Sequence, residues 1–182
     1  IALSGMVDAH THPIFAGIRA DEFCMRLDGA TYQEIANKGG GIQSSVKNST
    51  KASDAELAAL LRERMKTFAN HGVTTIEMKS GYGLTVAEEL RHLRVIKSVA
   101  ATSAQTVSAT CLALHAVPKD QPSAKVWADT CAKDLLPIVK AEGLADAVDA
   151  FIENGYFSVS DCENYLNKAQ ELGIHIRVHA DE

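Results

Sequence analysis

The chain has 182 residues, 46% of them hydrophobic, and a formal net charge of −5, which is an ordinary composition for one globular domain. The acidic balance argues against a nucleic-acid partner, because phosphate binding needs a basic face. No run reaches the roughly 18 apolar residues that a membrane helix needs, so no membrane partner is expected. A signal peptide is not recognised, and four widely spaced cysteines are expected to be free thiols of a cytoplasmic protein.

The first predicted element is a buried strand at residues 6–10, which leads into the motif His10-Thr11-His12. Side chains alternate between the faces of a strand, so the two histidines point the same way and can bind one divalent metal ion. A His-x-His pair also occurs by chance in many chains. Its place at the carboxyl end of an apolar strand, where barrel enzymes keep their chemistry, favours a metal site.

Two binding candidates follow the histidine pair. Arg19 could hold a substrate carboxylate, although a surface salt bridge is the commoner role of an arginine. Residues 31–48 form a predicted insertion after the first strand, where a barrel places its substrate loops, and Tyr32 is a weaker candidate within it.

Helical and strand-like segments alternate along the rest of the chain. A capping box of Ser53 and Glu56 begins a helix that ends before Gly72. Helical spacing of apolar residues predicts helices at 53–70, 85–101, 125–141 and 158–172. Short runs that are apolar on both faces predict further strands at 74–78, 106–112, 147–151 and 174–179.

This order predicts a parallel α/β architecture, as roughly the first five units of a TIM-type (β/α)8 barrel. The chain begins in what we interpret as a loop before a strand and ends within a predicted active-site loop. We therefore expect a piece of a longer protein.

Two further candidates follow the second and third strands. Two glycines flank Tyr82 and predict a tight loop at residues 79–84 that presents its ring. His115 comes after the strand at 106–112 and could donate to a developing oxyanion, or could be an ordinary loop histidine. Three other histidines are interpreted as structural, with one of them, His92, on a helix surface.

The last strand ends at His179, the predicted third metal ligand. Three nitrogen ligands leave an open position, where a bound water becomes a nucleophile near neutral pH. Glu182 could orient or deprotonate that water or hold a substrate N–H, although a solvated loop carboxylate is its ordinary role. Asp181 and Asp8 are interpreted as a solvated and a structural carboxylate.

Taken together, these motifs resemble the imidazolonepropionase family of the metal-dependent amidohydrolase superfamily. The matching segments run along the whole chain, at residues 7–12, 15–19, 29–32, 39–42, 71–75, 79–84, 115–118 and 179–182. The first motif indicates only the superfamily, whereas segments 79–84 and 115–118 are more specific. Leu114 stands where the family has glycine, and Ile152 where it has cysteine.

The resemblance implies a (β/α)8 barrel with one divalent metal, Zn or Fe, and a small flanking β-sandwich. Residues 1–182 would be the N-terminal part of the barrel domain, without the sandwich and the last strands. The metal ligands would be His10, His12 and His179. A fourth ligand, an aspartate, and a further histidine of the family would lie beyond this chain. The substrate pocket would include Arg19, Tyr82, His115 and Glu182.

The implied reaction is hydrolysis of the cyclic amide of 4-imidazolone-5-propanoate, with water, to N-formimidoyl-L-glutamate in histidine degradation. Glu182 and His115 would act at the ring, while Arg19 and Tyr82, with Tyr32, hold the carboxylate. The full-length protein is expected to be a cytoplasmic homodimer. Two alternatives stay open: another cyclic amidohydrolase or aminohydrolase of the superfamily, and an inactive metal-binding fragment.

Overall fold

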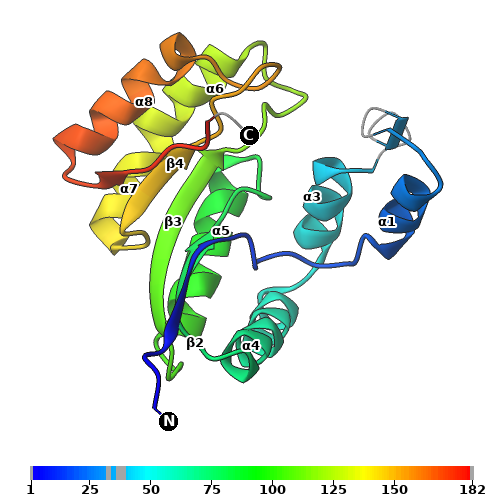
Figure 1. The fold of residues 1–182 in the computed structure, drawn as a ribbon. Helices are drawn as coiled ribbons and strands as arrows, with labels where there is room; N and C mark the ends of the chain where they lie inside the picture. The colour runs from blue at the N-terminus through cyan, green and yellow to red at the C-terminus, as the bar shows by residue number, and fades with distance from the viewer. Residues whose placement is uncertain (1, 32–33, 36–39, 181–182) are drawn as a thin grey trace.

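The computed structural model describes residues 2–31, 34–35 and 40–180 (Figure 1). Five parallel strands form one sheet in the order β1-β2-β3-β4-β5, so each strand pairs with its neighbours in the chain. The strands are β1 (Met6–Thr11), β2 (Val73–Lys79), β3 (Thr106–Leu114), β4 (Ala147–Ala150) and β5 (His175–Ile176). The predicted parallel α/β architecture is confirmed.

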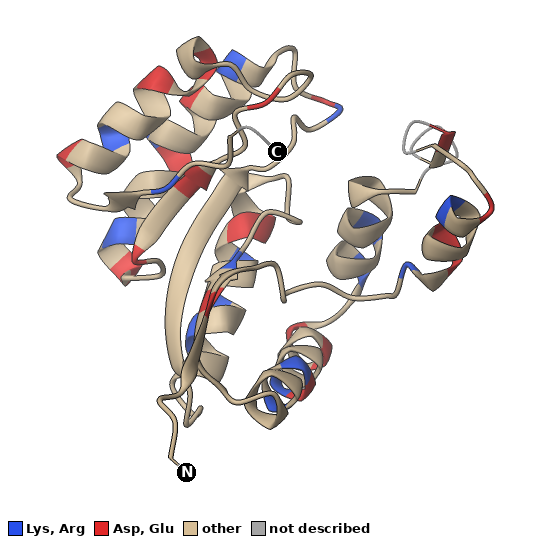
Figure 2. Cartoon of the chain, in the orientation of Figure 1, with Lys and Arg blue, Asp and Glu red and all other residues tan. Residues whose placement is uncertain are grey.

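Helices occupy most of the connections between the strands. They are α1 (Ala20–Leu27), α3 (Ile42–Lys51), α4 (Asp54–Asn70), α5 (Val86–Ala100), α6 (Ala124–Thr130), α7 (Leu136–Glu142) and α8 (Val159–Glu171). A π-helical turn, Cys131–Leu135, separates α6 from α7, so the single helix predicted at 125–141 is interrupted. Figure 2 shows acidic and basic segments interspersed along these helices.

Local signals in the sequence position the helix ends as predicted. The Ser53 hydroxyl accepts from Glu56 N, and the Glu56 carboxylate accepts from Ser53 N, which completes the capping box of α4. Gly72 follows with a φ of +81°, a conformation that favours glycine. The four cysteines lie in the described part of the chain and are free, as predicted. Among the described residues, no helix is long and apolar enough to cross a membrane.

The core lies between the sheet and its covering helices. One cluster joins α4 and α5 to β2, and includes Leu57, Leu61, Met65, Ile76, Met78 and Ile96. The other joins α5, α6, α7 and α8 to β3 and β4, and includes Leu93, Cys111, Trp127, Leu135, Val148 and Tyr165. Two helical layers of the chain therefore bury one face of the sheet.

The other face of the sheet is polar, which corrects the prediction that the strands are apolar on both faces. Along β2, Ile76 and Met78 enter the core. The alternate residues Glu77 and Lys79 are equally buried but contact Asp149 of β4 and other polar groups instead. A charged interior thus supports the carboxyl end of the sheet.

The two edge strands carry exposed apolar side chains. Met6 and Val7 of β1 are 55% and 66% exposed, and Ile176 and Val178, in and after β5, are 42% and 47% exposed. The predicted exposure of the first and fifth strands is confirmed. β5 is shorter than the predicted strand at 174–179, and beyond it a single bridge joins His179 to Phe151.

His92 lies inside the protein, not on a helix surface as predicted. Its side chain on α5 is fully buried, and neither ring nitrogen has a hydrogen-bond partner among the described residues. Burial, reinforced by the nearby Arg91 cation, lowers the pKa of His92 to about 4. The ring is therefore neutral in the folded protein at neutral pH.

We expect His92 to make stability fall as the solution is acidified. The unfolded chain takes up this proton near pH 6.5, whereas the folded chain takes it up only near pH 4, so stability is lost as pH falls between these values. Between pH 7 and pH 4.5 the wild type should lose about 2 kcal/mol more than His92→Leu. Urea unfolding at both pH values measures this difference. Equal losses in the two proteins would contradict the assignment.

Candidate active site

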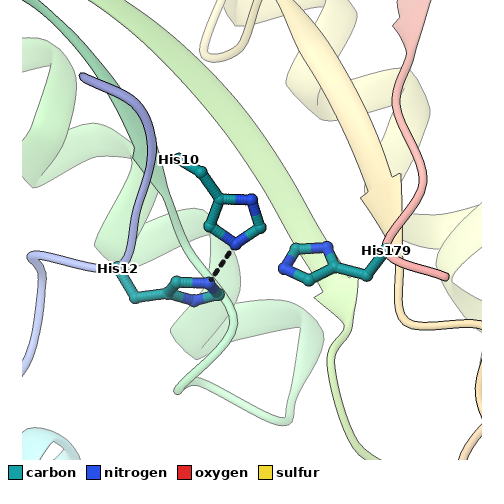
Figure 3. Close-up of side chains that lie close together, drawn as sticks. All are labelled: His10, His12 and His179. Atoms are coloured by element: carbon teal, nitrogen blue, oxygen red, sulfur yellow. Dashed lines mark hydrogen bonds between the residues drawn. The ribbon is translucent and has the colours of Figure 1, made fainter. Parts of the chain in front are cut away.

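Three histidines meet at the carboxyl edge of the sheet (Figure 3). His10 belongs to β1, His12 follows its last residue, and His179 follows β5. One ring nitrogen from each lies within 4.8 Å of the others. Strands 1 and 5 are at opposite edges of the sheet, so its curvature brings these residues together across the inner face. The structure thus groups the three predicted ligands.

The geometry of the three rings fits one metal ion. His10 Nε2 and His12 Nε2 are 3.2 Å apart, close to the roughly 3.3 Å between two nitrogen ligands of a tetrahedral zinc ion. Burial and the neighbouring His115 and His179 lower the pKa of His12 to about 3. Burial, followed by His179, also lowers the pKa of His10. Neutral imidazoles with free lone pairs are what a metal requires.

His115 and Tyr82 extend the cluster, as the sequence predicts. The ring centres of His12 and His115 are 4.9 Å apart, and those of Tyr82 and His115 are 5.4 Å apart. Phe151 lies 6.4 Å from His115 and 5.7 Å from His179, which adds an apolar wall. Residues that follow β1, β2, β3, β4 and β5 therefore surround one site.

The tautomer of His115 follows from its contact with Gly81. His115 Nδ1 is 3.1 Å from the Gly81 carbonyl, which can only accept, so Nδ1 carries the proton. Burial lowers the pKa of His115 to about 4, although the contact with Gly81 opposes this shift. In this tautomer Nε2 holds a lone pair and accepts a hydrogen bond. Donation to an oxyanion, the role expected from the sequence, would require a proton on Nε2.

Glu89 holds the loop that presents Tyr82, and sequence reasoning missed it. Its fully buried carboxylate accepts the backbone N–H groups of Gly81, Gly83 and Leu84 at 3.0, 2.7 and 3.2 Å. Burial nevertheless raises the pKa of Glu89. A Cβ atom on Gly83 would come within 2.5 Å of Glu89 N, so the loop needs glycine there. The available signal was a carboxylate on the apolar side of a helix.

Arg64 fixes the segment that follows His12. Its guanidinium donates to the carbonyls of Pro13 and Phe15 at 2.7 and 2.6 Å, and stacks 3.6 Å from the centre of the Phe15 ring. Phe15 in turn lies 6.1 Å from Tyr82, centre to centre. A residue of α4 thereby supports two sides of the site.

Arg19 is not among the residues that the histidine cluster brings together. It lies at the start of α1, forms a 2.7 Å salt bridge with Glu22, and its side chain is 39% exposed. Figure 1 shows α1 standing away from the sheet. Tyr32, Asp181 and Glu182 lie outside the described residues, so their predicted roles stay predictions.

A buried group of charges lies beneath the histidines and was not predicted. Lys79 Nζ lies 2.6 Å from Glu77 Oε1 and 2.7 Å from Asp149 Oδ2. Arg177 Nη1 lies 2.8 Å from the same oxygen of Glu77, and Thr110 donates to that oxygen at 2.5 Å. Two cations thus balance two carboxylates, as buried charges require.

This group touches the metal-binding cluster through Asp149. Its Oδ2 atom lies 2.8 Å from His179 Nδ1. Burial favours the neutral acid, but His179 and the Lys79 ammonium outweigh it and lower the pKa of Asp149 to about 2. Asp149 is therefore a carboxylate at neutral pH, facing a histidine of the cluster.

Comparison with known proteins gives one consistent result. No family model matches the chain. Curated proteins named imidazolonepropionase match it from end to end. The protein of Erwinia tasmaniensis is 46% identical over 183 residues, that of Symbiobacterium thermophilum 47% over 182, and that of Pseudomonas fluorescens 46% over 179.

These matches cover 100%, 99% and 98% of this chain, but only 45%, 43% and 45% of the relatives. The chain therefore spans less than half the length of the proteins it resembles. Over that span, its similarity is to proteins that carry the name imidazolonepropionase.

Proposed function

We propose that this chain is the metal-binding part of an imidazolonepropionase, a hydrolase of a cyclic amide in histidine degradation. The substrate would be 4-imidazolone-5-propanoate and the product N-formimidoyl-L-glutamate. The observation that carries the proposal is the grouping of His10, His12 and His179 at one edge of the sheet. The name shared by relatives at about 46% identity supports the same substrate.

We further propose that residues 1–182 are the first five units of a (β/α)8 barrel domain. Strand order equal to chain order in a parallel sheet supports this proposal, because a barrel adds each unit beside the last. Relatives more than twice as long as the chain leave room for the remaining units. Cytoplasmic location and a homodimer stay predictions.

The proposed ligands of the single Zn or Fe ion are His10, His12 and His179, and imidazole nitrogen suits both metals. When bound, such an ion polarises a carbonyl and makes water acidic enough to ionise near neutral pH. The chain's own groups would then position the substrate. Neutral His115 can accept a hydrogen bond at Nε2, and Glu182 is proposed to take a proton or hold the ring N–H.

Arg19 is proposed to hold the propanoate tail, and Arg19→Ala should then act on binding. The substrate carboxylate would compete with Glu22 for the guanidinium. Loss of a charge-assisted contact of about 2 kcal/mol would raise KM about 30-fold with kcat little changed. Steady-state kinetics of the full-length protein measure both constants. Arg94→Ala, which breaks an exposed pair with Glu142, is the matched control. An unchanged KM would remove Arg19 from the pocket.

The decisive test is hydrolysis of 4-imidazolone-5-propanoate by the full-length protein, with metal content measured in the same sample. Metal-dependent loss of the imidazolone absorbance would support the proposal. A metal-loaded protein that leaves this compound intact would overturn the substrate while keeping the metal centre. A panel of cyclic amides and aminated heterocycles would then identify the reaction.

A further inference from the structure

The contact between Asp149 and His179 links the charged interior to the metal centre. The two residues lie in and after neighbouring strands, β4 and β5. Backbone hydrogen bonds fix the main chain of His179: its N–H donates to the Ala150 carbonyl at 3.0 Å, and its carbonyl accepts from Ile152 N at 2.9 Å. What these bonds leave free is rotation of the imidazole ring.

Asp149 is itself held on both oxygens. Its Oδ1 accepts the Ala150 N–H at 2.8 Å, and its Oδ2 accepts from Lys79 Nζ at 2.7 Å. The side chains of Asp149 and Lys79 are both only 2% exposed. Glu77 anchors the ammonium from the other side at 2.6 Å. The carboxylate therefore has one fixed position, and its Oδ2 lies 2.8 Å from His179 Nδ1.

We propose that Asp149, fixed by Lys79, is a positioning residue that orients the His179 ring for metal binding. With Nδ1 turned to the carboxylate, the opposite nitrogen points toward His10 and His12 (Figure 3). A histidine that donates its other N–H to a carboxylate is held in one tautomer and one orientation, and becomes a better ligand. The inference rests on the proposed metal centre, and it is independent of the substrate.

The geometry gives this role to Asp149 alone among the nearby charged groups of the described chain. Glu77 Oε1 is already shared by Lys79, Thr110 and Arg177. The Asp149 oxygen, in contrast, contacts the ammonium on one side and the imidazole on the other. His179 Nδ1 is buried, and no described residue gives it a hydrogen bond of better geometry.

Asp149→Asn tests the proposal with almost no change in shape. Asparagine has a single oxygen, so it cannot accept from Ala150 N and also serve Lys79 and His179. We expect metal affinity to fall about 10–100-fold, the usual effect of losing such a partner. Competition with a chromophoric zinc chelator measures this in the full-length protein. The visible spectrum of bound Co²⁺ should also change, because the orientation of one ligand changes.

Asp146→Asn is the matched control, because Asp146 precedes the same strand at its opposite end and accepts only a backbone N–H from Ala109 at 2.9 Å. Its metal affinity should equal that of the wild type. Equal affinities in all three proteins would overturn the role of Asp149 and leave the proposed function standing. A wild type that binds no zinc would overturn the metal centre itself, and this inference with it.

A measurement on the wild type alone covers the case in which Asp149→Asn does not fold. Nitrogen-15 spectra of the metal-free protein report which imidazole nitrogen of His179 carries the proton. The proposal requires the proton on Nδ1. A proton on Nε2 would overturn it.

Discussion

His12→Ala should abolish metal binding and lower kcat/KM about 10³-fold or more. The reason is that His12 places Nε2 3.2 Å from His10 Nε2, so its loss leaves two histidine ligands from the described chain. A bound metal supplies several kcal/mol of stabilisation to the reaction, and each 1.4 kcal/mol corresponds to a factor of ten in rate. Metal content and hydrolysis of the full-length protein, measured on one sample, check both parts.

The control for this substitution is His175→Ala. His175 is the first residue of β5 and is exposed at the opposite end of the sheet from the cluster. It should keep wild-type metal content and activity. Thermal unfolding of both variants separates a lost ligand from a lost fold. A His12→Ala protein that stays folded and retains stoichiometric metal would exclude His12 as a ligand.

The sequence predicts the ligands well because their signals are local. His10 and His12 share a strand face through the period of two, and parallel strands place their carboxyl ends at one edge. The same reasoning placed Tyr82 and His115 next to them, and the ring distances of 4.9–6.2 Å among His12, Tyr82 and His115 confirm it. Strand ends are predictable from apolar runs and from the glycines that follow.

The charged interior was missed because its contacts are not local. Lys79 and Asp149 are 70 residues apart, and their strands β2 and β4 are separated by β3. Which residues meet across two strands depends on register and sheet curvature, and neither can be read from spacing. One signal was available: Glu77, Lys79 and Asp149 interrupt otherwise apolar strands, and charges in such positions are rarely unpaired.

His92 and Arg19 show the limit of reading a single residue type. A histidine on a helix is exposed or buried according to which stripe it joins, and His92 lies on the stripe of Leu93, Ile96 and Val99, which face the core. Arg19 follows the site in sequence, but the segment that carries it leads away to α1 (Figure 1). Sequence proximity to a site does not set proximity in space when a connection leaves the sheet.

Lys79→Met should destabilise the protein by about 3–5 kcal/mol, the usual result of removing one partner of a buried ion pair. Methionine has a similar length, so the main loss is the charge. Oxygens of Glu77 and Asp149 both lie within 2.7 Å of the ammonium nitrogen that disappears. Arg177 and Thr110 still contact Glu77, so Asp149 becomes the poorly compensated carboxylate. Urea unfolding of the wild type and the variant measures the difference.

The pH dependence of this loss identifies its cause. In Lys79→Met the folded protein would bind a proton on Asp149 more readily than the unfolded chain does, so the deficit should be largest at neutral pH and shrink toward pH 5. Adding Asp149→Asn should recover part of the stability, because it removes the uncompensated charge. Lys97→Met, which removes an exposed lysine that donates to the Glu142 carbonyl, should change stability by less than about 0.5 kcal/mol. A pH-independent deficit without recovery would show that lost packing, and not an unbalanced carboxylate, destabilises the variant.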